Sequence, residues 1–131
     1  MNLSELAQQY RGATLPKLID RHVKSLNQDA LVQAIQGTYE RLPLAFRPQA
    51  DAYTMAYLEN WFGPHIVTAD LADVFAAAVS DIKAVALRAN VSLSDDQVLE
   101  VFNIMVMRMA HFAHAKPDLR KMLGIKKGWF S

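Results

Sequence analysis

The stretch from Ser94 to His114 constrains the fold most, because its helix start, its period and its stop signal all agree. Ser94 and Gln97 have the spacing of a capping box, in which a serine oxygen accepts from a first-turn amide and the glutamine side chain reaches back. Pro117 stands just beyond the far end, where a helix is expected to stop. One broad apolar face runs between these signals: Val98, Val101, Phe102, Met105, Val106, Met109, Phe112 and Ala113.

The rest of the chain has the same helical period, interrupted at short intervals by glycine, proline and asparagine. Helices are expected over about residues 3–10, 15–26, 28–42, 48–62, 69–89 and 94–115, with one or two further turns at 117–123. No stretch has a convincing strand pattern and no repeat is present. The sequence therefore predicts an all-α fold, a single compact bundle of six to seven helices with short links, over residues 1–131. Gly63-Pro64 is a possible division between two helical layers, and residues 125–131 form a tail.

Three local features carry specific expectations about packing. Leu44 and Phe46 lie between two prolines, and we expect both side chains to turn inward. The helix over 48–62 is apolar over half its circumference, so we expect it to be central in the domain. Thr68 is expected to cap the helix that follows it, with Asp70 near the positive end of that helix.

The absence of cysteine excludes a disulfide framework, a thiolate nucleophile and a cysteine-rich zinc site. The N-terminus has no basic stretch followed by an apolar run, and the two most apolar windows, 71–89 and 98–115, are interrupted by charges. We therefore expect a cytoplasmic, bacterial protein with no membrane segment. Its net charge of +1 conceals an acidic middle and a basic end: residues 48–100 carry eight acidic and two basic side chains, and residues 101–131 carry one and six.

His22 lies at the centre of an apolar helix face, and an aromatic stripe lies at helical spacing on the helix over 48–62: Tyr53, Tyr57 and Trp61. A histidine facing a cavity lined by aromatic rings is the arrangement of a helical protein that binds a small ligand or a tetrapyrrole. The alternative is that the rings are ordinary core and that His22 is a hydrogen-bonded structural residue. A cavity near His22 is thus an alternative hypothesis, and no resident cofactor is predicted.

Met107, His111 and His114 project to one side of the last long helix. Two imidazoles and a thioether at this spacing can approach one metal ion. A structural zinc site, however, needs four ligands and a catalytic one needs three from the protein. The stripe therefore predicts no metal site, and we interpret it as part of an interface between two copies of the chain.

The C-terminal end combines a basic patch, Arg120, Lys121, Lys126 and Lys127, with the aromatic pair Trp129 and Phe130. Such a combination can contact phosphates through charge and bases through stacking, so nucleic-acid binding is a second alternative. The acidic middle of the chain disfavours it. The two aromatics are otherwise expected to join the interface.

No nucleophile with a base, paired catalytic carboxylates or phosphate-binding glycine loop stands out, so we do not expect an enzyme. Hydrophobic residues make up 52% of the chain, above the roughly 45–50% of a globular domain. Apolar residues also fall outside the expected core faces, namely Leu87, Ile104 and Met107. Surplus apolar surface is what an oligomer needs, so the leading hypothesis is a protein–protein interaction or regulatory module that forms a homo-oligomer, most simply a dimer.

Overall fold

The Ser94 capping box forms and starts the longest helix, α7 (Asp95–Ala115). The amide of Gln97 donates to Ser94 Oγ at 3.2 Å, and the amide of Ser94 donates to Gln97 Oε1 at 3.0 Å. The computed structural model describes residues 2–61 and 68–115; the side chains of 57–61 lie outside this description. Within those ranges the chain has six α-helices, a three-residue 3₁₀ helix and no strand, so the predicted all-α class is confirmed. The elements before α7 are α1 (Leu3–Gln9), α2 (Leu15–Ser25), α3 (Gln28–Glu40), η1 (Leu44–Phe46), α4 (Arg47–Trp61) and α6 (Leu71–Arg88).

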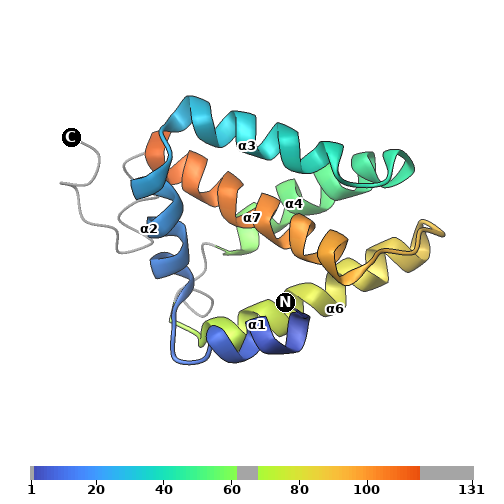
Figure 1. The fold of residues 1–131 in the computed structure, drawn as a ribbon, viewed down its shortest axis with the longest axis horizontal. Coiled ribbons are helices and arrows are strands. Elements are labelled where there is room, and N and C mark those ends of the chain that lie inside the picture. The colour runs from blue at the N-terminus through green and yellow to red at the C-terminus, as the bar shows by residue number, and fades with distance from the viewer. Residues whose placement is uncertain (1, 62–67, 116–131) are drawn as a thin grey trace.

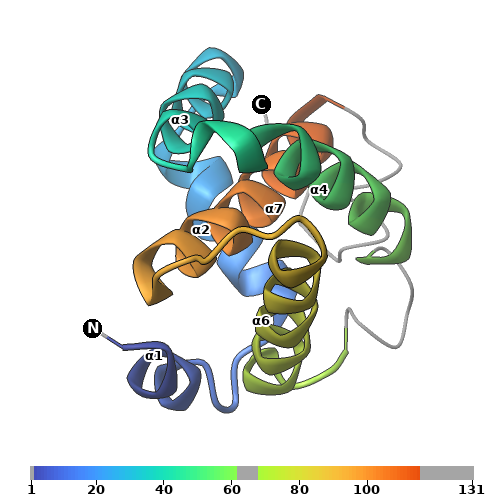
Figure 2. The same cartoon turned by 90° about the vertical axis from the view of Figure 1, so that its right-hand side faces the viewer.

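Helix α7 is the central element of the described fold. It contacts α2, α3, α4 and α6, most extensively α3, and Figures 1 and 2 show these helices arranged around it. The expectation that the helix over 48–62 is central was wrong. The physical reason is that α7 is apolar on nearly every side, with ten buried residues, whereas α4 exposes positions such as Asp51 and Met55. A helix that is apolar all round has to be surrounded.

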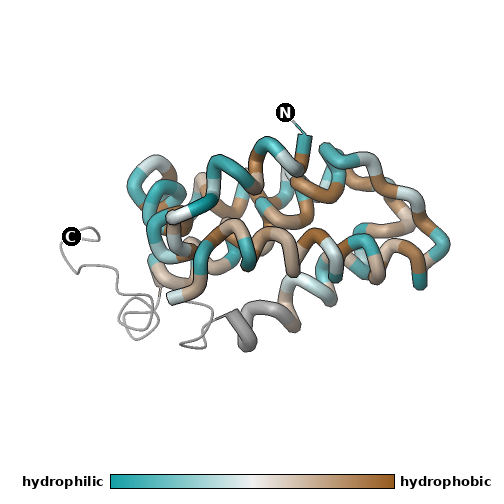
Figure 3. The backbone as a smooth tube through the Cα atoms, turned by 90° about the horizontal axis from the view of Figure 1, so that it is seen from below, coloured by the Kyte–Doolittle hydropathy of each residue, from teal (hydrophilic) through white to brown (hydrophobic). Residues whose placement is uncertain are grey.

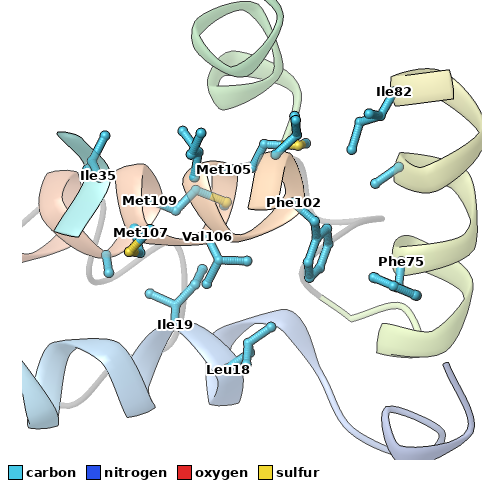
Figure 4. Close-up of a cluster of buried hydrophobic side chains, with 14 of the residues drawn as sticks. Leu18, Ile19, Ile35, Phe75, Ile82, Phe102, Met105, Val106, Met107 and Met109 are labelled. Carbon is cyan, nitrogen blue, oxygen red and sulfur yellow. The ribbon is translucent and has the colours of Figure 1, made fainter. Parts of the chain in front are cut away.

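Two of the three residues interpreted as surplus apolar surface belong to this core. Ile104 is fully buried and Met107 is only 5% exposed, and Figure 4 shows Met107 in one cluster with Ile19 of α2 and Ile35 of α3. Their interpretation as surface was wrong, because helices from the first half of the chain cover that side of α7. Leu87 is indeed exposed, at 77%. Figure 3 shows hydrophilic and apolar residues alternating along the helices, as expected for elements that bury one side.

The helix ends are set by local hydrogen bonds. Asn27 caps α3 by accepting from the amide of Ala30. Asn90 ends α6 with a φ of 56°, and the amide of Val91 donates to the Ala86 carbonyl at 2.9 Å, as in a Schellman motif. The start of α3 and the end of α6 agree with the helix ends predicted from the sequence.

Asp70, and not Thr68, caps α6. One Asp70 oxygen accepts from the amide of Ala72 at 2.9 Å, and the other accepts from the amide of Gly12 at 2.9 Å. The amide of Leu71 donates to the Ala13 carbonyl at 2.8 Å. Asp70 is the residue directly before the first turn, so its carboxylate reaches both the α6 amides and the α1–α2 link.

Within the described ranges, no helix is long and apolar enough to cross a membrane. The predicted division at Gly63-Pro64 and the tail over 125–131 lie outside the described residues.

Candidate functional site

The corner between α3 and α4 is one part of the surface where exposed apolar residues lie around a hollow. Arg47 fixes the corner by donating from Nε to the Leu42 carbonyl at 3.3 Å and from Nη2 to the Glu40 carbonyl at 3.1 Å. These carbonyls lie at the end of α3, where the helix leaves acceptors unpaired. The guanidinium therefore holds the start of α4 against the end of α3.

Within η1, Phe46 and Leu44 lie on opposite sides of the chain. Phe46 is 1% exposed and anchors the turn in the core, whereas Leu44 is 75% exposed. The expectation that both side chains turn inward was wrong, because a 3₁₀ helix has about three residues per turn and residues two apart cannot share a face.

Leu44 begins a stripe along the outer side of η1 and α4. Pro48, Asp51 and Met55 follow it at spacings of four, three and four residues, all exposed, with Met55 at 42%. An open groove of about 390 Å³ lies against this stripe, lined by Tyr39, Leu44, Arg47, Pro48 and Asp51. We call this the docking groove.

A charged network beside the docking groove ties it to the central helix. Arg108 of α7 donates from Nη2 to Asp51 Oδ1 and also to the Tyr39 hydroxyl, the latter at 2.6 Å. The Tyr39 hydroxyl in turn donates to Asp51 Oδ1 at 3.0 Å. The Thr54 hydroxyl lies 3.4 Å from that of Tyr39, and Arg108 Nη1 lies 2.9 Å from Met55 Sδ. The Arg108 side chain is 16% exposed and that of Asp51 is 60% exposed. The pair neutralises a largely buried cation and presents Tyr39 at the groove in a fixed orientation.

A second ion pair holds α3 on α7 farther along. Arg41 donates from Nε to Glu100 Oε1 at 2.9 Å and from Nη2 to Oε2 at 3.2 Å, with a further bond to Thr38 Oγ1. The hydrogen bond and the charge of Glu100 raise the pKa of Arg41. Together with Arg108, this bidentate pair links α3 to α7 on the side next to the groove.

The predicted cavity around His22 stays a prediction. His22 is half-buried on α2, and burial, helped by the charge of Arg21, lowers its pKa. Tyr53 is half-buried on α4 and packs on the core. The side chains of Tyr57 and Trp61, which would complete the site, lie outside the described residues.

The predicted interface stripe on α7 is divided by the structure. Met107 belongs to the core, whereas His111 and His114 are half-buried near the C-terminal end of the helix. The His111 ring packs edge-on against Phe112, with centroids 5.9 Å apart, and among the described residues nothing hydrogen-bonds to its buried Nδ1. The described part of the chain has no group of three potential metal ligands.

The predicted basic patch and aromatic pair fall beyond residue 115, outside the described residues: Arg120, Lys121, Lys126, Lys127, Trp129 and Phe130. The nucleic-acid alternative rests on this segment and stays a prediction.

Sequence reasoning missed the network around Arg108. The available signal was a lone arginine between Met107 and Met109, in the middle of an apolar run. A charge placed there needs a partner from a neighbouring helix. Nothing in the sequence identified that partner as Asp51, which lies 57 residues earlier.

Comparisons of the chain with protein-family models, with curated proteins and with solved structures found no match.

Proposed function

We propose that this protein is an interaction module that associates with a second copy of itself through the docking groove. The observation that supports this most directly is the exposure of Leu44, at 75%, on a corner held rigid by Arg47 and Phe46. An exposed leucine on a backbone that is already ordered can contact a partner without a further loss of backbone conformational entropy. It also lies beside a hollow of its own chain, so each copy offers both an apolar projection and a place to receive one.

A twofold dimer fits this arrangement, because a twofold interface uses the same patch on both subunits. Leu44 of one copy would lie against Tyr39 and Pro48 of the other. Of the two charged residues that line the docking groove, Asp51 pairs with Arg108, and Arg47 directs its guanidinium to the Leu42 and Glu40 carbonyls of its own chain. Met55, one turn along α4, extends the apolar contact.

Sedimentation equilibrium from low to high micromolar concentration tests the proposal, with Leu44→Ser as the variant and Leu87→Ser as its matched control. Leu87 is 77% exposed, so the control removes an equally exposed leucine from another part of the surface. Burying a leucine contributes about 1.5–3 kcal/mol, and the dimer contains the residue twice. We therefore expect Leu44→Ser to weaken association at least about a hundredfold and Leu87→Ser to leave it unchanged. A wild-type chain that stays monomeric throughout, or equal behaviour of the two variants, would overturn the proposal.

A further inference from the structure

A second hollow lies where α1 ends, between that helix, the first half of α2 and the start of α6. It has a volume of about 190 Å³ and is more enclosed than the docking groove. Its wall includes Tyr10, Ala13, Lys17, Leu18, Arg21 and Leu71. The volume is below the roughly 300–1,000 Å³ of sites for drug-sized molecules, so the hollow suits a small ligand.

The walls of this pocket are fixed by contacts between elements distant in sequence. The Gly12 amide donates to Asp70 at 2.9 Å and the Leu71 amide to the Ala13 carbonyl at 2.8 Å, which joins the α1–α2 link to α6. The Tyr10 ring packs edge-on against Phe75, with centroids 5.3 Å apart, beneath the core that Figure 4 shows around Phe75 and Phe102. The pocket is therefore formed before any ligand arrives.

The charged residues of the pocket are both cations. Lys17 and Arg21 lie one turn apart on α2, and within the described ranges neither forms an ion pair with a carboxylate. The nearby carboxylates have other partners: Asp20 pairs with Lys24 at 3.2 Å, and Asp70 accepts from the amides of α6 and the link.

Tyr10 adds a neutral donor to this rim. Burial raises the pKa of its hydroxyl, which the charge of Arg21 only partly offsets, so the phenol stays protonated at neutral pH. Among the described residues, none hydrogen-bonds to that hydroxyl. The wall thus carries two positive charges, the Tyr10 hydroxyl and the Gln9 side chain, and its apolar part comes from Ala13, Leu18 and Leu71.

We propose that this pocket binds a small organic carboxylate, whose anionic group contacts Lys17 and Arg21 and whose apolar body lies against Ala13 and Leu18. Two cations without carboxylate partners select for an anion. The apolar part of the wall gives a ligand with a small hydrocarbon part a contact that a bare inorganic ion cannot make. The site is distinct from the docking groove, which lies on the α3–α4 corner.

Titration of the ¹⁵N-labelled full chain by NMR tests this, with benzoate as the probe, benzyl alcohol as its neutral counterpart and inorganic phosphate as the bare anion. Benzoate is expected to shift the amide signals of Ala13, Leu18 and Leu71 in a saturable way. Benzyl alcohol and phosphate are expected to bind at least about tenfold more weakly, since each lacks one half of the recognised chemistry.

The variant Arg21→Gln should weaken benzoate binding by about tenfold, the change expected for losing one charge-assisted hydrogen bond. Arg88→Gln is the matched control, because it makes the same substitution at an exposed position of α6 that lies outside the pocket wall. Circular dichroism of both variants shows that the fold is retained. The proposal is overturned if benzoate fails to bind, if its shifts map elsewhere, if either comparison ligand binds as tightly, or if the two variants lose affinity equally.

Discussion

The effect of Met107→Ala on the unfolding free energy distinguishes most clearly between a role of Met107 in the core and a role in an interface. The sequence interpretation places Met107 in an interface with a second copy of the chain, whereas the structure buries it to 5% exposure inside one chain, near Ile19 and Ile35. Because Met107 is a core residue, Met107→Ala removes three side-chain heavy atoms from a packed interior and leaves a cavity. If the interface interpretation holds, the same change leaves the isolated chain almost unaffected.

The two outcomes differ by more than the error of the measurement. Truncating a buried methionine to alanine typically costs about 2–5 kcal/mol, the sum of lost transfer free energy and the cavity left behind. Domains of this size have a total unfolding free energy of about 5–15 kcal/mol. The loss should therefore lower the melting temperature by roughly 8–20 °C, at about 4 °C per kcal/mol. A surface substitution stays within about 0.5 kcal/mol.

Urea unfolding followed by circular dichroism measures this loss, with Leu87→Ala as the exposed control and several protein concentrations for each chain. Because dimer formation makes apparent stability depend on concentration, a core residue and an interface residue respond differently. We expect the same loss for Met107→Ala at every concentration, with an unchanged dependence on urea. A loss below about 0.5 kcal/mol, or one seen only where the dimer forms, would refute the placement of Met107 in the core.

Two further predictions concern charged groups. Asp51→Asn should lower the unfolding free energy, measured by urea unfolding, by about 1–2 kcal/mol, because Arg108 loses its charged acceptor. The loss is smaller than for a buried pair because the Asp51 side chain is exposed. An unchanged unfolding free energy would show that solvent screens the pair completely. Since burial lowers the pKa of His22, the unfolded chain takes up a proton at this residue more readily than the folded chain does. The contribution of His22 to stability should therefore be intact above about pH 6.5 and fall as the pH decreases below it. In thermal melts between pH 7 and pH 5, the melting temperature of His22→Gln should decrease less than that of the wild type, and equal decreases would contradict this role.

The sequence predicted best those features that neighbouring residues determine. The capping box at Ser94 and Gln97, the cap at Asn27 and the end of α6 at Asn90 all depend on side chains within a few residues of the backbone groups they satisfy. The all-α class followed from the same local periods. The cap of α6 was misassigned to Thr68, although the bond that makes Asp70 the cap is the local one from Ala72; the second Asp70 bond, from Gly12, joins residues 58 positions apart and could not be predicted.

The arrangement of the helices could not be predicted from such local sequence patterns. A hydrophobic period shows that a helix has an apolar face, but it does not show how many neighbours cover the helix. Ile104 and Met107 were assigned to the surface because they lie off the main stripe of α7, and only the packing of α2 and α3 on that side makes them core. The Arg108 network was equally invisible, because its members come from α3, α4 and α7.

The exposure of Leu44 follows from its neighbour more than from its own chemistry. Phe46 is the larger apolar group and is 1% exposed, so it determines which side of η1 faces the core. With about three residues per turn, Leu44 projects from a different side of η1, which here faces away from the core. Leu44, at 75% exposed, consequently contributes little to the stability of the free chain. An apolar side chain that the fold does not bury, on a corner the fold holds rigid, is the physical basis for placing self-association at this groove.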